Sequence, residues 1–77
     1  MTSSARWTRG TVASWNNDGW GVLDSPDTPG GCFALWAHIA SDEVRDLRVG
    51  QAVQFSYEQA DQDDYPFRAT YITLDPT

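Results

Sequence analysis

The sequence contains no lysine, a single cysteine and no long apolar run. One cysteine excludes an internal disulfide framework and any zinc site built from four thiolates. No apolar segment approaches the roughly 18 residues that a membrane-spanning helix requires. The first residues also lack the basic region and the apolar stretch of a signal peptide. We therefore expect a soluble, cytoplasmic protein that has no membrane partner.

The charge of the chain is strongly one-sided. All five cationic residues are arginines and stand against 11 acidic residues, so the formal net charge is −6. Such a chain repels phosphate at long range, which argues against a nucleic-acid partner held by charge alone. With 77 residues, of which 40% are hydrophobic, the chain can build one hydrophobic core and hence one domain.

Short runs rich in β-branched and aromatic residues, separated by turn residues, predict an all-β domain. Asn16-Asn17-Asp18-Gly19 is a dense turn signal, and it predicts a β-hairpin between the first two runs. The five expected strands are residues 11–15, 20–23, 32–38, 52–57 and 67–74. Residues 1–9 are expected to form a flexible arm, residues 41–47 one helical turn capped by Ser41, and residues 58–64 an acidic loop. Five short strands and one helical turn favour a small closed barrel.

Alternation along the second expected strand separates its residues into two faces. Gly21 and Leu23 share one face, and Trp20 and Val22 share the other. If the aliphatic face points into the barrel, Trp20 points toward water. Trp15 joins it on the outer face unless a bulge in the hairpin shifts the register.

The same reasoning applied to the third expected strand places Leu35 and Ala37 inside and Trp36 and His38 outside. Several large rings on one exposed sheet face imply a binding partner. Unstacked nucleic acid suits such rings, because each base stacked on an aromatic side chain contributes roughly 1–3 kcal/mol. The competing interpretation is that the tryptophans fill the core of the barrel and that His38 is a structural histidine.

Four segments resemble bacterial cold-shock proteins, in the order in which that family has them. Residues 10–23 resemble the opening hairpin, with Asp18-Gly19-Trp20-Gly21-Val22-Leu23 in place of the first ribonucleoprotein motif, Lys-Gly-Phe-Gly-Phe-Ile. Leu35-Trp36-Ala37-His38-Ile39 resembles the second motif, Val-Phe-Val-His-Phe. Residues 47–55 are similar to the family's Leu-x-x-Gly-Gln-x-Val-x-Phe segment, and residues 66–74 to its closing strand.

The resemblance implies a five-stranded antiparallel oligonucleotide-binding (OB-fold) barrel over residues 10–74. It further implies a monomer that binds single-stranded RNA or DNA as an RNA chaperone or a regulator of transcription or translation under stress. Matching positions make Trp20, Trp36 and His38 stacking residues, and Phe67 and Arg68 beside the closing strand are expected to add contacts. The complete expected nucleic-acid site is Trp15, Trp20, Val22, Trp36, His38, Ile39, Phe67 and Arg68.

Several departures from the family pattern weaken the expected affinity. Asp18 stands where the motif has Lys, Ser14 where it has an aromatic residue, and Val22 and Ile39 where it has Phe. Asp18, Val22 and Ile39 favour a rival hypothesis, in which the barrel is a protein-interaction module that has lost most of its nucleic-acid affinity. Phe33 has no clear counterpart and is either an additional ring or a core residue.

The remaining candidates for chemistry are weak. Cys32 is expected to be a small buried hydrophobic residue rather than a redox sensor. Asp61, Asp63 and Asp64 lack the central Gly and the terminal Glu of a calcium-binding loop. No nucleophile lies beside a plausible base, and the one histidine has no second metal ligand near it in sequence. We expect neither catalysis, nor a cofactor, nor a metal.

Overall fold

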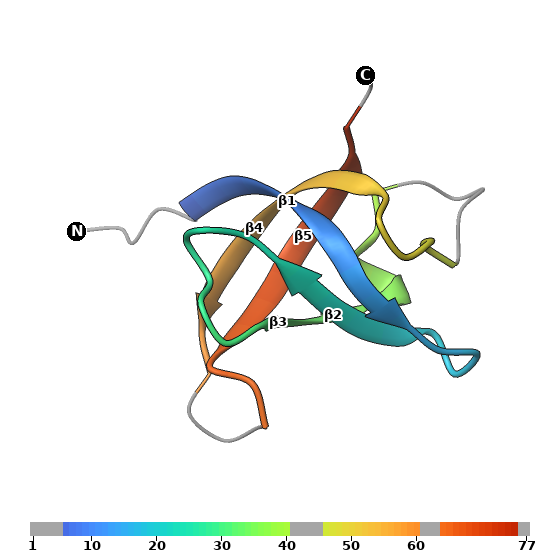
Figure 1. Cartoon of the computed structure of the whole chain (residues 1–77), viewed down its shortest axis with the longest axis horizontal. Helices are drawn as coiled ribbons and strands as arrows, with labels where there is room; N and C mark the ends of the chain where they lie inside the picture. Colours follow the sequence, from blue (N-terminus) through green and yellow to red (C-terminus); the bar gives the residue numbers. More distant parts are fainter. Residues whose placement is uncertain (1–5, 41–45, 61–63, 76–77) are drawn as a thin grey trace.

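The computed structural model describes residues 6–40, 46–60 and 64–75. These residues form five strands and one short 3₁₀ helix, which close into a barrel with the strand order β1-β2-β3-β5-β4 (Figure 1). The elements are β1 (Arg6–Trp15), β2 (Trp20–Asp24), β3 (Cys32–Leu35), η1 (Trp36–His38), β4 (Ala52–Gln59) and β5 (Phe67–Leu74). The predicted all-β closed barrel of five strands is confirmed. Within the described ranges, no helix is long and apolar enough to span a membrane.

The strand β1 is longer than predicted, because it begins at Arg6 instead of residue 11. Its first half pairs with β4, from Arg6 opposite Tyr57 to Thr11 opposite Ala52, and its second half pairs with β2. Residues 6–9, which were assigned to a flexible arm, are therefore part of the barrel wall. The sequence signal was weak there because only Trp7 among residues 6–9 is apolar.

The hairpin between β1 and β2 forms as predicted. The amide of Asn16 donates to the carbonyl of Trp20, and the amide of Gly19 donates to the carbonyl of Asn16. The side-chain Oδ1 of Asn16 also accepts from the amide of Asp18 at 2.9 Å, as an Asx turn requires. Gly19 has a φ of 89°, which a residue without a Cβ adopts at little cost.

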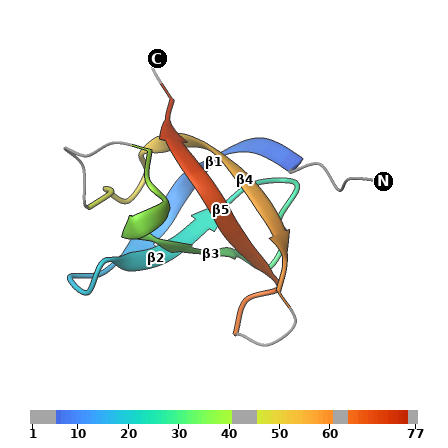
Figure 2. The ribbon, with the colours of Figure 1, turned by 180° about the vertical axis from the view of Figure 1, so that it is seen from behind.

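The predicted antiparallel barrel contains one parallel pairing. The strands β3 and β5 run in the same direction, with Cys32 opposite Phe67 and Phe33 opposite Arg68. Strand directions cannot alternate all the way round a ring of five, so at least one pair must be parallel. Figure 2 shows β5 crossing the front of the barrel, with the 3₁₀ turn η1 beside it.

The interior of the barrel is filled by aliphatic side chains around one phenylalanine. Phe55 of β4 is fully buried together with Leu23 of β2 and Ile72 of β5. The buried core cluster is Val12, Leu23, Cys32, Ala34, Ile39, Leu47, Val53, Phe55, Ala69 and Ile72. None of the described tryptophans belongs to this buried set, although the partly buried Trp15 packs against it.

Two other sequence predictions lie partly outside the described residues. The expected helical turn over residues 41–47 falls mainly on residues 41–45, which are outside the described ranges. The expected acidic loop over residues 58–64 begins later than predicted, because β4 continues to Gln59. The described residues 46 and 47 are not helical.

Candidate functional site

The outer face of the β2–β3 pair carries two aromatic rings. Trp20 and Val22 lie on one face of β2, and the register sets them opposite Leu35 and Phe33 of β3. The rings of Trp20 and Phe33 lie 5.6 Å apart between centroids with an interplanar angle of 31°. Both residues are partly exposed, whereas Val22 is only 8% exposed. The prediction that Trp20 points outward is therefore confirmed, and Phe33 is a surface ring rather than a core residue.

The predicted inward position of Leu35 and Ala37 is wrong. Cys32 and Ala34 point into the core with no exposed surface, while Leu35 is 36% exposed and Ala37 is also exposed. The strand ends at Leu35, and a 3₁₀ turn follows over Trp36–His38. A period of two does not continue through a 3₁₀ turn, so the alternation predicted for a strand running to His38 does not hold beyond Leu35.

Trp36 and His38 lie in η1, not in a strand. Trp36 is 44% exposed, and its backbone amide donates to the carbonyl of Gly19 at 2.8 Å. A Cβ on Gly19 would collide with Cδ1 of Trp36, so the indole rests directly on the hairpin turn. The prediction that Trp36 is exposed is confirmed. His38 is half-buried, and its Nδ1 is buried without a hydrogen-bond partner in the part of the chain that the structure describes.

Trp15 points to the other side of the sheet from Trp20. The register of β1 against β2 shifts between Val12 and Ser14, so Ser14 faces outward opposite Val22 and Trp15 lies opposite Gly21. A Cβ on Gly21 would lie 2.6 Å from Cε3 of Trp15, and the indole packs against the core cluster. The bulge considered in the sequence analysis thus removes Trp15 from the outer face.

Ile39 and Phe67 also lie away from the outer rings. Ile39 is 8% exposed, belongs to the core cluster and forms an isolated bridge with Ile72. Phe67 packs against the same core, with its ring 5.7 Å from that of Tyr57. Ile39 follows the 3₁₀ turn, Phe67 is the first residue of β5, and both side chains point inward. The motif pattern alone did not predict these orientations.

Arg68 lies on the outer surface beside the ring of Phe33, because β3 and β5 pair these two residues. Its guanidinium forms an ion pair with Glu58, and its Nε donates to Oε2 of Glu58 at 3.0 Å. Both side chains are about half exposed, so the pair adds little to stability. It does neutralise the positive charge that Arg68 would otherwise present to a phosphate.

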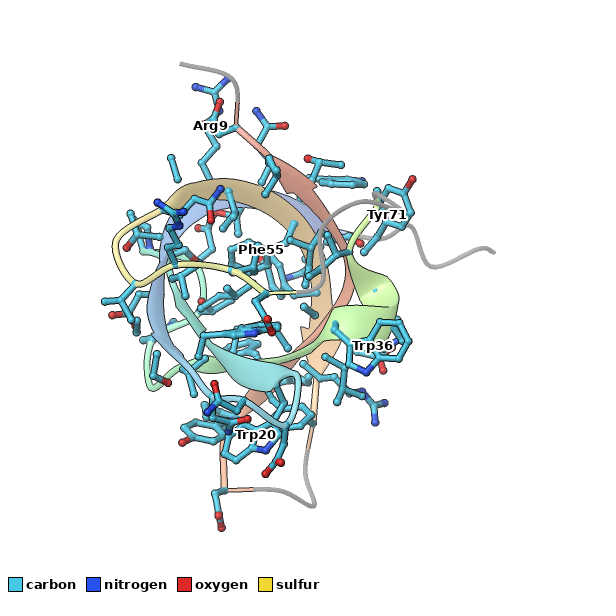
Figure 3. All side chains as sticks on the ribbon, turned by 90° about the vertical axis from the view of Figure 1, so that its right-hand side faces the viewer. Arg9, Trp20, Trp36, Phe55 and Tyr71 are labelled. Atoms are coloured by element: carbon cyan, nitrogen blue, oxygen red, sulfur yellow. The ribbon has the colours of Figure 1, made fainter. Side chains whose placement is uncertain are left out.

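An open pocket of about 200 Å³ adjoins Trp36, which Figure 3 shows projecting from the side of the barrel. It is lined by Asn17, Asp18, Gly19, Trp36 and Asp46. The Oδ1 atom of Asp46 accepts a hydrogen bond from Nε1 of Trp15 at 3.1 Å. An indole and two carboxylates line the pocket, so it can accept a flat ring whose edge carries hydrogen-bond donors, or a cationic group.

The thiol of Cys32 has no part in this surface. Burial raises its pKa from 9.0 to about 12, so the thiolate does not form near neutral pH. The expectation of a small buried hydrophobic residue is confirmed. In the described ranges, no three His, Cys, Asp or Glu side chains gather as metal ligands.

Sequence reasoning missed a second group of exposed rings. Trp7 of β1 is 51% exposed and Tyr71 of β5 is 49% exposed, with ring centroids 5.8 Å apart. The available signal was the alternation around Trp7, in which Thr8 lies between two outward residues, Trp7 and Arg9. Because residues 1–9 are mostly polar, the sequence predicts an arm there and gives Trp7 no face.

The comparisons with known proteins bear on the fold. No protein-family model matches the chain, and no curated protein matches it in sequence. The solved structure of Drosophila Unr CSD456 matches it with a TM-score of 0.72 and 21% sequence identity over 94% of this chain. The match spans 28% of the Unr chain. The chain therefore has the fold of a cold-shock domain and is about three tenths as long as that protein chain.

Proposed function

We propose that the chain binds single-stranded RNA or DNA by stacking bases on the outer rings of β2, β3 and η1. The observation that carries this proposal is the pair of Trp20 and Phe33 on the outer face of the sheet, continued by Trp36 on the adjoining turn. Aromatic rings left partly open to water on a sheet of this fold offer flat platforms that suit any base. The cold-shock-domain fold, which the chain shares with Unr CSD456, supports the same reading.

The expected affinity comes from stacking and not from charge. Each stacked base contributes roughly 1–3 kcal/mol, so two or three rings together contribute about 2–9 kcal/mol, and the upper end of this range corresponds to micromolar binding of a short oligonucleotide. Asp18 and Asp46 beside Trp36 repel phosphate, and Arg68 is already paired with Glu58. The bound nucleic acid must therefore place its bases on the rings and keep its phosphates away from the acidic pocket beside Trp36.

The finer role that we propose is that of an RNA chaperone or a regulator of transcription or translation. Stacking without base-edge recognition holds many sequences in the unpaired state and releases them readily, which suits this role. The proposal includes a non-enzymatic, monomeric protein that acts in the cytoplasm, in keeping with the absence of a catalytic pattern in the sequence.

A fluorescence titration with a pyrimidine-rich oligonucleotide tests the proposal. Stacking bases should quench Trp20 and Trp36, and Trp36→Ala should weaken binding by about 1–3 kcal/mol. Trp36→Phe keeps a ring on the turn and is the matched control, with a much smaller expected loss. An affinity that Trp36→Ala leaves unchanged would show that this face is not the binding surface, provided that the variant melts as the wild type does.

The pocket beside Trp36 supports a second candidate function, a protein-interaction module that accepts a cationic side chain. Asp18→Asn separates the two functions because it changes them in opposite directions. Removing one carboxylate should strengthen oligonucleotide binding, whereas it should weaken binding of an arginine-rich peptide. A wild-type chain that binds the peptide and not the oligonucleotide, in a manner sensitive to Asp18→Asn, would establish the second function in place of the first.

A further inference from the structure

A second aromatic surface lies on the outer face of the β1–β4–β5 sheet. Trp7 of β1 and Tyr71 of β5 both lie opposite Ser56 of β4 in the strand register, so one small residue separates them. Their rings meet edge to face at 80°, with centroids 5.8 Å apart. Ser56 is only 2% exposed, and its hydroxyl lies 2.7 Å from that of Thr70. The two rings thus form a continuous aromatic patch over a satisfied polar group.

The rings in this patch are open to a flat ligand. An edge-to-face contact covers one face of only one of the two rings, and about half of each residue is exposed. Neither residue belongs to the buried core cluster. The patch therefore has the same property as the pair of Trp20 and Phe33, which is a π-surface that faces water.

The strands that carry the Trp7–Tyr71 patch are positively charged, in a chain that is negative as a whole. The strands β1, β4 and β5 carry three arginines, Arg6, Arg9 and Arg68, and a single carboxylate, Glu58. Their net charge is 3 − 1 = +2 in a chain whose net charge is −6. Glu58 is already paired with Arg68. Arg9 lies on the same face of β1 as Trp7, two residues further along the strand.

We propose that the Trp7–Tyr71 patch is a second stacking site for single-stranded nucleic acid, a proposal that rests on the function proposed above. Aromatic rings beside an arginine on positively charged strands match the bases and phosphates of a single nucleic-acid strand. A second copy of the chain is disfavoured as the occupant, because both copies would bring the same positive strands together.

Trp36 of the first site and Tyr71 of the second lie on one side of the barrel. Figure 3 shows Tyr71 and Trp36 projecting on the same side. The chain around η1 is joined to β5 next to Tyr71, because the amide of Ala40 donates to the carbonyl of Ile72 at 2.8 Å. A nucleic-acid strand with one base stacked on Trp36 can therefore continue to Tyr71 and then to Trp7. An oligonucleotide of about 12 nucleotides should contact both sites, whereas one of about 4 should fill only one of them.

The test compares pyrimidine-rich oligonucleotides of these two lengths on the full chain. Trp7→Leu and Tyr71→Leu keep an apolar side chain and remove the ring, so each should weaken binding of the long oligonucleotide at least about fivefold. Trp7→Phe keeps a ring and should bind nearly as the wild type does. Val49→Ala removes an apolar side chain that is 69% exposed elsewhere, and it should leave affinity unchanged.

The outcomes separate this inference from the proposed function. Loss of affinity in Trp36→Ala with wild-type affinity in Trp7→Leu and Tyr71→Leu would overturn the second site alone. Loss in the two leucine variants without loss in Trp36→Ala would support the second site and overturn the first. A wild-type dimer in sedimentation that becomes a monomer in Trp7→Leu would overturn the inference and assign the patch to a second copy.

A measurement on the wild-type chain keeps the inference testable even if a leucine variant fails to fold. The indole N–H signal of Trp7 in a proton NMR spectrum can be assigned by its loss in Trp7→Phe. That signal should shift when the long oligonucleotide is added. A Trp7 signal that stays in place while the Trp20 and Trp36 signals move would overturn the second site.

Discussion

At the scale of single residues, burial decides what Cys32 can do. Its side chain has no exposed surface and belongs to the core cluster, among Leu23, Ala34 and the other aliphatic residues. Taking charge out of water is costly, so the thiol stays protonated up to a pKa of about 12. Since the thiolate is the reactive form, the native residue is inert toward oxidants and electrophiles at neutral pH.

The raised pKa of Cys32 predicts a specific loss of stability at alkaline pH. The thiol of the unfolded chain ionises above pH 9.0, whereas the folded thiol keeps its proton up to about pH 12. The unfolded state then binds fewer protons, so this contribution is fully present below pH 9.0 and is lost between pH 9.0 and about 12. At about pH 10 the loss should be about 1 kcal/mol.

Urea denaturation at neutral and alkaline pH measures this effect, with Cys32→Ala as the control. The variant has a constant packing defect but no titrating thiol, so its stability should fall less with pH than that of the wild type. Equal falls in the two proteins would contradict the assignment. Thiol labelling should also be slow in the native protein and fast in urea.

Individual residues also show what could be read from the sequence about the site. The faces of Trp20 and Leu23 followed from strand alternation, because β2 is regular over their whole stretch. Trp15 could not be placed, because one bulge residue moves a ring from one side of the sheet to the other. Ile39 was misplaced because a family motif records residue types but not the point at which a strand becomes a 3₁₀ turn.

At the scale of elements, the first strand joins the two halves of the barrel. The same ten residues pair with β4 through their first half and with β2 through their second half. The segment from Arg6 to Arg9 supplies four of the register pairs with β4. Without them, β4 would have an unpaired edge and the fully buried Phe55, which pairs with Thr8, would lose its cover.

Removing residues 1–9 should therefore strongly destabilise the domain. Each backbone hydrogen bond that is lost costs about 0.5–1.5 kcal/mol, so the total loss is several kcal/mol in a domain of marginal stability. A shift of the thermal midpoint by ten degrees or more is expected, on the order of several degrees per kcal/mol. If the truncated chain melts at the wild-type temperature, residues 6–9 do not act as a structural strand.

The third strand marks the limit of prediction at this scale. Its existence was evident from Cys32-Phe33-Ala34-Leu35, but its end was not, because Trp36, His38 and Ile39 continue the strand-like composition. The 3₁₀ turn is stabilised by a tertiary hydrogen bond from the amide of Trp36 to the carbonyl of Gly19. Contacts between distant segments decide such boundaries, and no local pattern contains them.

At the scale of the whole molecule, charge and aromatic rings are unevenly distributed. The acidic residues Asp18 and Asp46 line the pocket beside Trp36, while the strands β1, β4 and β5 together are positive. The net charge of −6 therefore describes no single surface of the protein. The closed barrel itself was predictable, since turn residues separate its five strands at short intervals.

This distribution predicts a shallow dependence of oligonucleotide affinity on salt. Few cations are available to displace counterions, so the slope of log affinity against log salt should correspond to about one to three charges. Titrations between about 50 and 200 mM salt measure it. A slope equivalent to about six or more phosphate contacts would show that charge, and not stacking, provides the affinity.

The parallel seam between β3 and β5 has a consequence for the motions of the barrel. It is held by two register pairs, against seven between β4 and β5. Local opening is easiest where the fewest hydrogen bonds must break together, so amide hydrogens at this seam should exchange fastest among the paired strands. Phe33 of β3 and Arg68 of β5 lie opposite each other in this pairing. A nucleic-acid strand that contacts both residues would hold β3 and β5 together and slow their local opening. Binding of the nucleic acid and pairing of β3 with β5 would then stabilise each other, because both involve the same two residue pairs.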